Sequence, residues 1–312
     1  MLQYIIILLD DTCASFCHYD VTVKDQKLID YEVLKAGIIF AMKENLNVQF
    51  VFPDYELPAL YTDLIESIDH ACIKPESVAK NTDVVVLNKW QEEIKNEMVN
   101  NATCIIRANR QELKTYKENV KLLLSKVSRL NVVLIDIEDF SDDDISDYEN
   151  YLIEMTEYMV NLYHSGRNVQ LNLLTDRAML PEMNNCNAGV GNITLAPNGK
   201  FYLCPAFYYK DPNLDVGSLS SGLDIKNKQL LRLDHAPICR ICDAYQCKRC
   251  IYLNERLTLE YNTPSHQQCV IAHLERNATR EFLKRLDRNG IRIDNCQIIK
   301  EMKELDPFNT LQ

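Results

Sequence analysis

Short apolar runs alternate with longer amphipathic stretches over the first 180 residues of this chain. An isolated apolar run of four to six residues is typical of a buried strand. The longer stretches place apolar positions at helical spacing. Strands are therefore predicted at residues 4–9, 48–51, 83–87, 104–108, 131–135 and 169–173, and helices at residues 28–44, 57–67, 89–99, 110–128 and 146–165.

Six strands separated by helices predict an α/β fold with parallel strands and right-handed crossovers. The pattern alone fits a doubly wound sheet as well as a partial barrel. Within it, Ser146 is the expected N-cap of the helix at 146–165 because acidic residues follow it. The acidic stretch 139–150 is expected to be a solvated loop that leads into this helix.

The periodic pattern stops between residues 180 and 190, where Gly, Pro, Asn and Cys become frequent. A polar helix is then predicted at 265–289, with Gly290 as its C-terminal stop. We therefore expect three parts: a barrel-like domain at 1–180, a cysteine-rich domain at 181–275, and a helix and tail at 276–312.

Seven of the twelve cysteines lie between residues 186 and 269, and four of them follow the spacing Cys-x2-Cys-x4-Cys-x2-Cys. Thiolates are the preferred ligands of zinc and of iron–sulfur clusters. A single zinc site could use the four closely spaced cysteines, but the gap between the two pairs is short for a zinc ribbon. Two iron–sulfur clusters would use all seven, which are Cys186, Cys204, Cys239, Cys242, Cys247, Cys250 and Cys269.

Composition and charge narrow the class of protein. The net charge of −11 argues against nucleic acid or an anionic membrane as partner, since both favour basic surfaces. The apolar run at 4–9 is too short to span a bilayer, and no basic segment precedes it. We therefore expect a cytoplasmic protein whose thiols are reduced, in which clustered cysteines indicate metal.

The cysteine pattern resembles the SPASM domain of radical SAM peptide-modifying enzymes. The hairpin of such domains is similar to the segment ITLAPNGKFYLCPAF, which contains Gly199-x4-Cys204. The turn that follows this hairpin is similar to DVGSLSSG at 215–222. The usual central spacing of the family is Cys-x2-Cys-x5-Cys-x3-Cys. This chain is therefore one residue shorter in each of two gaps.

The resemblance implies a ligand set for two [4Fe–4S] clusters. Auxiliary cluster II would be held by Cys239, Cys242, Cys247 and Cys269. Auxiliary cluster I would be held by Cys186, Cys204 and Cys250, which leaves it one cysteine short. Its fourth iron could be open, could take a substrate thiolate, or could bind another side chain, with His235 and His266 as candidates.

The loop after the first strand resembles a damaged S-adenosylmethionine (SAM) cluster motif. Radical SAM enzymes carry Cys-x3-Cys-x2-Cys there, and this chain has Cys13-x3-Cys17 with Asp20 in the third position and His18 beside it. The region after the second strand, 52–60, also lacks the glycines that the family uses to hold SAM. The resemblance implies a degenerate SAM site, so SAM as a cofactor is doubtful. Two unrelated loop cysteines are the alternative.

The opening IIILLDDTCASFCHY together with this architecture is similar to the CXXX repeat peptide maturases. That resemblance implies a partial (β/α)6 TIM-like barrel followed by a small SPASM-like domain. It also implies a cysteine-repeat precursor peptide as substrate and a second radical SAM maturase as partner. Two alternatives stay open: an active radical SAM enzyme using Cys13, Cys17 and Asp20, and a non-catalytic protein with structural zinc.

The other three cysteines fit no ligand spacing. Cys104 opens a predicted strand, and small buried cysteines are common in cores. We therefore predict that Cys72, Cys104 and Cys296 are buried residues without a metal role.

Overall fold

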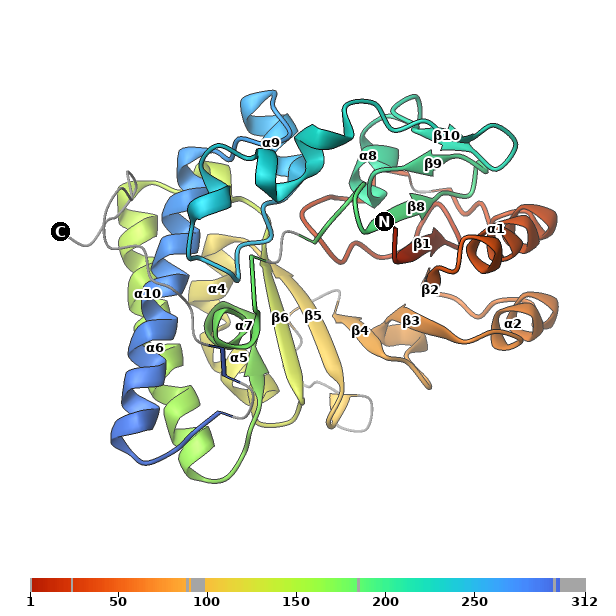
Figure 1. Ribbon diagram of the computed structural model, residues 1–312. Coiled ribbons are helices and arrows are strands. Elements are labelled where there is room, and N and C mark those ends of the chain that lie inside the picture. Colours follow the sequence, from red (N-terminus) through yellow and green to blue (C-terminus); the bar gives the residue numbers. More distant parts are fainter. Residues whose placement is uncertain are drawn as a thin grey trace. The chain divides into compact units, whose positions relative to one another are not determined.

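The chain forms two compact units in the computed structural model, which describes residues 2–23, 25–87, 90, 99–183, 186–293 and 296–297. Unit 1 comprises residues 1–88 and 186–235, and unit 2 comprises residues 89–185 and 236–312 (Figure 1). The domain boundaries expected near residues 180 and 275 stay a prediction. In the described ranges, every helix is too short or too polar to cross a membrane.

Unit 1 contains a sheet in the order β4-β3-β2-β1-β8-β9. All described neighbours in it pair in parallel, except for the antiparallel β8–β9 hairpin. The strands are β1 (Tyr4–Leu8), β2 (Asn47–Val51), β3 (His70–Pro75), β4 (Val84–Leu87), β8 (Asn192–Leu195) and β9 (Phe201–Tyr202).

The apolar run at the N-terminus forms β1, an interior strand of this sheet between β2 and β8. Ile5, Ile7 and Leu8 of β1 are fully buried, as a strand covered on both faces requires. The sequence did not predict β3, because Lys74 and the terminal His70 interrupt the apolar pattern. The predicted hairpin is present, and Gly199 turns it with a φ of 77°.

The helices of unit 1 begin with α1, whose N-cap Asp30 accepts a hydrogen bond from the backbone N–H of Glu32. Gly37 lets this helix approach the sheet closely, since a Cβ there would lie 2.4 Å from Leu195 Cδ2. The remaining elements are short. Unit 1 contains α1 (Tyr31–Lys43), α2 (Ala59–Glu66), η1 (Glu76–Val78), α8 (Pro205–Lys210), β10 (Gly217–Ser218), β11 (Gly222–Leu223), η3 (Lys228–Leu231) and η4 (Leu233–His235).

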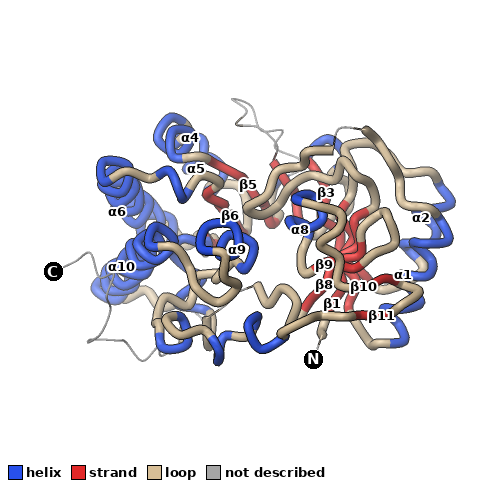
Figure 2. Tube along the Cα trace, turned by 90° about the horizontal axis from the view of Figure 1, so that it is seen from above, coloured by secondary structure: helices blue, strands red, loops and turns tan. Residues whose placement is uncertain are grey.

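Unit 2 contains three parallel strands in the order β7-β6-β5. Two long helices, α6 and α10, pack side by side beside them (Figures 1 and 2). The elements are β5 (Thr103–Ala108), α4 (Arg110–Thr115), α5 (Lys117–Leu124), β6 (Arg129–Leu134), η2 (Ile137–Asp139), α6 (Asp142–His164), β7 (Gln170–Leu171), α7 (Asn172–Met179), η5 (Cys239–Ile241), α9 (Ile251–Thr258) and α10 (His266–Arg288).

Helix boundaries in unit 2 depend on capping residues. Ser265 caps α10 through a reciprocal capping box with Gln268, as the predicted start at 265 requires. The prediction for α6 was wrong by one turn, because Ser141 with Asp144 forms the capping box instead of Ser146. Most of the acidic stretch 139–150 is therefore helical.

Two further predictions in unit 2 need correction. The helix expected at 110–128 is divided at Tyr116 into α4 and α5. The strand expected at 169–173 ends at Leu171, where the side chain of Asn172 accepts from Val132 N and donates to Val132 O. The backbone of a continuing strand would make these two hydrogen bonds to Val132. Because the Asn172 side chain makes them instead, the backbone can begin α7 at this point. Most of the helix expected at 89–99 lies outside the described residues.

Candidate iron–sulfur sites

All twelve cysteines lie in the described residues, and none forms a disulfide. Cys72 and Cys104 are buried as predicted, whereas the prediction for Cys296 was wrong because it is exposed. Across the described parts of the chain, no three His, Cys, Asp or Glu side chains form a group that could hold a single metal ion.

The four cysteines predicted for cluster II all belong to unit 2. Cys239 opens η5, Cys242 and Cys247 lie in the following loop, and Cys269 lies in the first turn of α10. The Ser265 capping box fixes that first turn. Cys239 and Cys269 are buried, while Cys242 and Cys247 are half-buried.

Backbone N–H groups point at the sulfur atoms of this loop. Ala244 N donates to Cys242 Sγ and Arg249 N donates to Cys247 Sγ, each at 3.4 Å. His273, which is buried, places its Nε2 atom 3.7 Å from Cys242 Sγ. Hydrogen bonds to sulfur stabilise the thiolate form that binds metal.

Burial opposes ionisation of the same thiols. The pKa of Cys239 is raised to about 11 by burial and by Cys242, against the opposing charge of Arg249. The pKa of Cys247 is raised well above its ordinary value, first by burial and then by the charges of Cys239, Cys242 and Cys269. Negative charge on any of the other three predicted ligands would thus raise the pKa of Cys247. Metal binding would have to displace these protons.

A cationic cluster lies next to this loop. Asp243 is 1% exposed and forms ion pairs with Arg276 at 3.0 Å, Arg280 at 2.7 Å and Arg177 at 3.3 Å. Burial raises the pKa of Asp243, but the three guanidinium groups hold it below its ordinary value. Three arginines facing one carboxylate leave an excess of positive charge beside the cysteines. The buried Arg249 adds to it. Such surroundings fit an anionic cluster with four thiolate ligands.

The predicted SAM-cluster loop of unit 1 has a different character. Cys13 is fully buried, its Sγ donates to Val51 O at 2.9 Å, and it accepts from Asp10 N at 3.3 Å. Burial raises the pKa of this thiol far above its ordinary value. Cys17 is half-buried and Asp20 is exposed. The three residues therefore do not fit a site in which three equivalent ligands face one cluster.

An aspartate–tyrosine network follows β1, which the sequence analysis did not identify. Asp10 accepts from Tyr55 Oη at 2.7 Å, and Asp11 accepts from the Tyr208 hydroxyl. Burial raises the pKa of Asp11, although Tyr208 opposes the shift. The two acidic residues directly after an apolar strand were the available signal, since polar residues at a strand's carboxyl end often line a site.

The cysteines predicted for cluster I fall in both units. Cys186 and Cys204 belong to unit 1, and Cys250 belongs to unit 2, where it occupies the N-cap position of α9 without a side-chain capping bond. Cys186 has a φ of 56°, which is uncommon for a residue other than glycine. Cys204 is the N-cap of α8.

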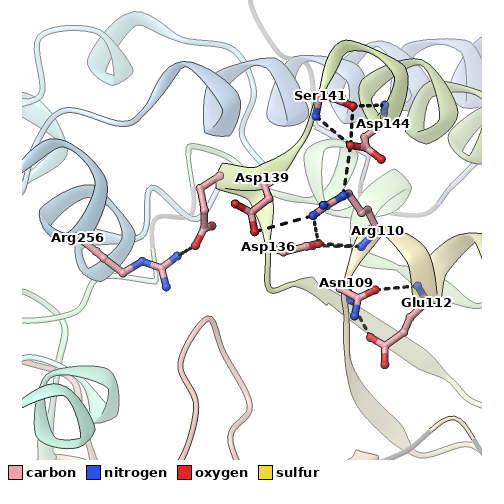
Figure 3. A network of polar contacts seen from close by, with 9 residues as sticks. Asn109, Arg110, Glu112, Asp136, Asp139, Ser141, Asp144 and Arg256 are labelled. Atoms are coloured by element: carbon pink, nitrogen blue, oxygen red, sulfur yellow. Dashed lines mark hydrogen bonds and ion pairs between the residues drawn. The ribbon is translucent and has the colours of Figure 1, made fainter.

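A polar network at the carboxyl ends of β5 and β6 was also not predicted (Figure 3). Arg110 pairs with Asp136 at 2.6 Å and with Asp144 at 3.2 Å, and Glu138 pairs with Arg256 of α9. A cavity of about 160 Å³ beside it is lined by Arg110, Gln111, Leu113, Lys114, Lys117, Phe140, Asp144, Asp147, Tyr148, Asn150, Tyr151 and Glu154.

The chain is similar in structure to solved radical SAM enzymes. Native anSMEcpe with bound AdoMet and the Cp18Cys peptide superimposes with a TM-score of 0.59 at 13% identity, over 92% of this chain and 97% of that chain. Histidine-tagged anSMEcpe with bound AdoMet superimposes with a TM-score of 0.58 at 14% identity, over 93% of this chain and 100% of that chain. SuiB from Streptococcus suis, bound to precursor peptide SuiA, has a TM-score of 0.45 at 12% identity, over 84% of this chain and 75% of that chain.

No protein-family model matches this sequence, and no curated protein matches it. At such low identity, the similarity to anSMEcpe concerns the fold alone. It confirms the predicted fold class, α/β with the partial TIM-like architecture of radical SAM enzymes.

Proposed function

We propose that this chain is an iron–sulfur protein that takes part in maturing a ribosomally made cysteine-repeat peptide, with a radical SAM maturase as partner. This is the role that its resemblance to the CXXX repeat peptide maturases implies. The observation that carries the proposal is the cluster II set in unit 2, where backbone N–H groups donate to two of the four cysteines and buried arginines pair with Asp243 in the same loop.

The residues of unit 2 fit a [4Fe–4S] cluster chemically. Cys239, Cys242, Cys247 and Cys269 would hold it, and such a cluster supplies one-electron transfer when bound. The chain's own contribution is electrostatic. Ala244 N and Arg249 N donate to sulfur, and the arginines around Asp243 offset negative charge. Both effects favour the more negative, reduced state of a cluster.

A second cluster is proposed on Cys186, Cys204 and Cys250, as the SPASM resemblance implies. A peptide substrate is supported by the fold, since anSMEcpe of the same fold was solved with the Cp18Cys peptide. A thiolate of the substrate is a suitable soft ligand for iron, so the peptide could be positioned through its cysteines.

SAM cleavage by this chain alone is not part of the proposal. Cys13 makes a core hydrogen bond to Val51 O, and Asp20 supplies a harder oxygen ligand in place of sulfur. An active radical SAM enzyme using Cys13, Cys17 and Asp20 is the first alternative, because anSMEcpe of the same fold binds AdoMet. Structural zinc in a non-catalytic protein is the second.

The test is the iron and sulfide content of the full chain after anaerobic reconstitution with ferrous iron and sulfide. Two clusters predict about eight irons per chain in the wild type. Cys242→Ser should lose up to about four of them, because one ligand of cluster II is removed. Cys296→Ser is the matched control, since this cysteine is exposed and outside the predicted ligand sets, and its iron content should equal that of the wild type.

The outcomes separate the alternatives. Zinc without sulfide would support a structural zinc protein, and 5′-deoxyadenosine formed from SAM and a reductant would support an active radical SAM enzyme. Binding of a fluorescent peptide with cysteine every fourth residue, followed by anisotropy, tests the substrate class. Equal anisotropy with a matched serine peptide would contradict a cysteine-directed role.

A further inference from the structure

A glutamate on α10 connects this helix with α6 and with the loop that carries Cys247. Glu275 is half-buried on α10, which packs beside α6 (Figures 1 and 2). Its Oε1 atom accepts a hydrogen bond from Tyr148 Oη of α6 at 2.9 Å, and its Oε2 atom accepts one from Gln246 Nε2 at 3.4 Å. Gln246 also donates to Ala272 O at 2.6 Å, so it is held against α10. The carboxylate thus lies one hydrogen bond from the chain neighbour of Cys247.

The two hydrogen-bond donors of Glu275 are neutral groups. Asp243, in the same unit, pairs with three arginines, whereas no ion pair between described residues includes Glu275. A carboxylate that is removed from water without a cation is more easily protonated. Burial accordingly raises the pKa of Glu275 to about 7, although the hydrogen bonds from Tyr148 and Gln246 oppose the shift. This carboxylate can therefore change its protonation state near neutral pH.

Charged groups act on Glu275 from other elements as well. Asp176 of α7 raises its pKa, and Lys248 of the cysteine loop lowers it. On α10 itself, His273 precedes Glu275 by two residues and places Nε2 3.7 Å from Cys242 Sγ. A charge on the cysteine loop thus affects this carboxylate, and a further negative charge there would favour its protonated form.

Tyr148 connects Glu275 with the cavity beside α4. Tyr148 is one of the residues that line this cavity of about 160 Å³. Its ring stacks with that of Tyr151, another lining residue, with centroids 6.1 Å apart, and its hydroxyl donates to Glu275. A phenol can both donate and accept a hydrogen bond, so a single residue is sufficient to pass a proton between the cavity and the carboxylate.

We propose that Glu275 is the proton acceptor coupled to one-electron reduction of cluster II. Glu275 takes up one proton from solvent when one electron from a low-potential donor reaches the cluster, and its carboxylate becomes a carboxylic acid. The electron adds one negative charge to unit 2 and the proton removes one, so the net charge is unchanged. Charges in a poorly solvated region interact strongly, which makes this compensation favourable. The inference rests on the proposed function, since it requires cluster II.

The experiment is a redox titration of the anaerobically reconstituted full chain, followed by EPR at several pH values. The signal that is absent from Cys242→Ser identifies cluster II. In the wild type, the midpoint potential of this cluster should fall as pH rises through the neutral range. The slope should approach about 59 mV per pH unit, the value for one proton taken up with one electron.

Glu275→Gln should remove this pH dependence. Glutamine resembles the protonated carboxyl group, so the variant should keep, at every pH, the potential that the wild type has at low pH. Glu281→Gln is the matched control, because it makes the same change on the exposed side of α10, where Glu281 pairs with Arg285 at 2.9 Å. It should show the pH dependence of the wild type.

Tyr148→Phe gives a second measurement that keeps the carboxylate. It removes a hydrogen bond that lowers the pKa of Glu275, so the pH range over which the potential changes should move to higher pH. Tyr158→Phe is the control on the same helix, because its hydroxyl donates to a backbone carbonyl, Lys121 O, at 2.9 Å. It should leave the range where the wild type has it.

Three results would overturn the inference: a wild-type potential that is independent of pH, an unchanged pH range in Tyr148→Phe, or a wild-type pH dependence in Glu275→Gln. In the last case another group, such as His273, would be the one that responds. Iron and sulfide are present in all three cases, so the proposed function would stand. A chain that binds no iron and sulfide would overturn the proposed function and the inference together, and the two failures are therefore distinct.

Discussion

The cysteine loop of unit 2 and the loop after β1 in unit 1 carry the same residue type in opposite surroundings. In unit 2, the sulfur atoms of Cys242 and Cys247 accept N–H groups next to buried arginines. In unit 1, Cys13 donates its own proton to Val51 O, and the buried acids Asp10 and Asp11 precede it. Burial raises the thiol pKa in both settings, but only the first also supplies N–H donors and arginines that would stabilise thiolates bound to a metal.

The difference shows why a cysteine spacing alone does not identify a metal site. Cys13 and Cys17 have the spacing of a cluster motif, yet the surroundings of Cys13 are those of a core residue. Ionisation needs hydrogen-bond donors or cations near the sulfur. In unit 2 the donors are N–H groups two residues along the same loop, whereas Arg177 and Arg276 come from distant parts of the chain. Three changes test this contrast.

Asp243→Ala should have the largest effect. It leaves three arginines, two of them almost fully buried, without their carboxylate. Breaking a buried ion pair on one side costs about 3–5 kcal/mol of unfolding free energy. Urea denaturation measures the change in the free energy of unfolding. Asp147→Ala is the control in the same unit, because its pair with Lys114 is exposed, and it should change stability little. Similar losses in both variants would contradict the role of the cationic cluster.

Cys13→Ala should have the next largest effect, on stability alone. It removes the donor to Val51 O, which still accepts from Leu9 N, and it removes the sulfur that accepts from the buried Asp10 N–H, a loss of about 1–3 kcal/mol. Cys13→Ser should recover part of this loss because it restores a donor. Thermal denaturation and iron content are measured on the same samples. A loss of iron without a loss of stability would show that Cys13 is a ligand and not a core residue.

The pH dependence of stability should differ in sign between the two regions. The pKa of Asp11 is raised by burial in the folded state, so its contribution weakens stability as pH rises toward and through that pKa. Burial of Asp243 is outweighed by its arginines, and its pKa is lowered. Its stabilisation is therefore present above the ordinary carboxyl range and is lost as pH falls through the folded pKa.

This smallest effect is measured as a change in slope. Asp11→Asn should flatten the decline of stability with rising pH, and Asp243→Asn should flatten the decline with falling pH. Urea midpoints across the acidic and neutral range give both slopes. Changes in slope of the same sign in the two variants, each relative to the wild type, would contradict the assignment of these carboxylates.

The sequence by itself determined features that depend on near neighbours in the chain. The Ser265–Gln268 capping box spans three residues, and the helix start predicted at residue 265 agrees with it. The turn at Gly199 needs only a residue that tolerates positive φ. The alternation of apolar runs and helices gave the α/β class, because burial of a parallel sheet requires that pattern.

Only the tertiary structure decided which cysteines lie in suitable surroundings. The Cys13–Val51 bond joins residues 38 apart, and Arg177 reaches Asp243 from 66 residues away. The strand β3 was missed for a similar reason, since its place between β2 and β4 outweighs its polar residues. Charge and burial around a side chain are sums over distant segments. A linear spacing cannot report them, and for that reason the sequence suggested ligands while the fold determined their chemistry.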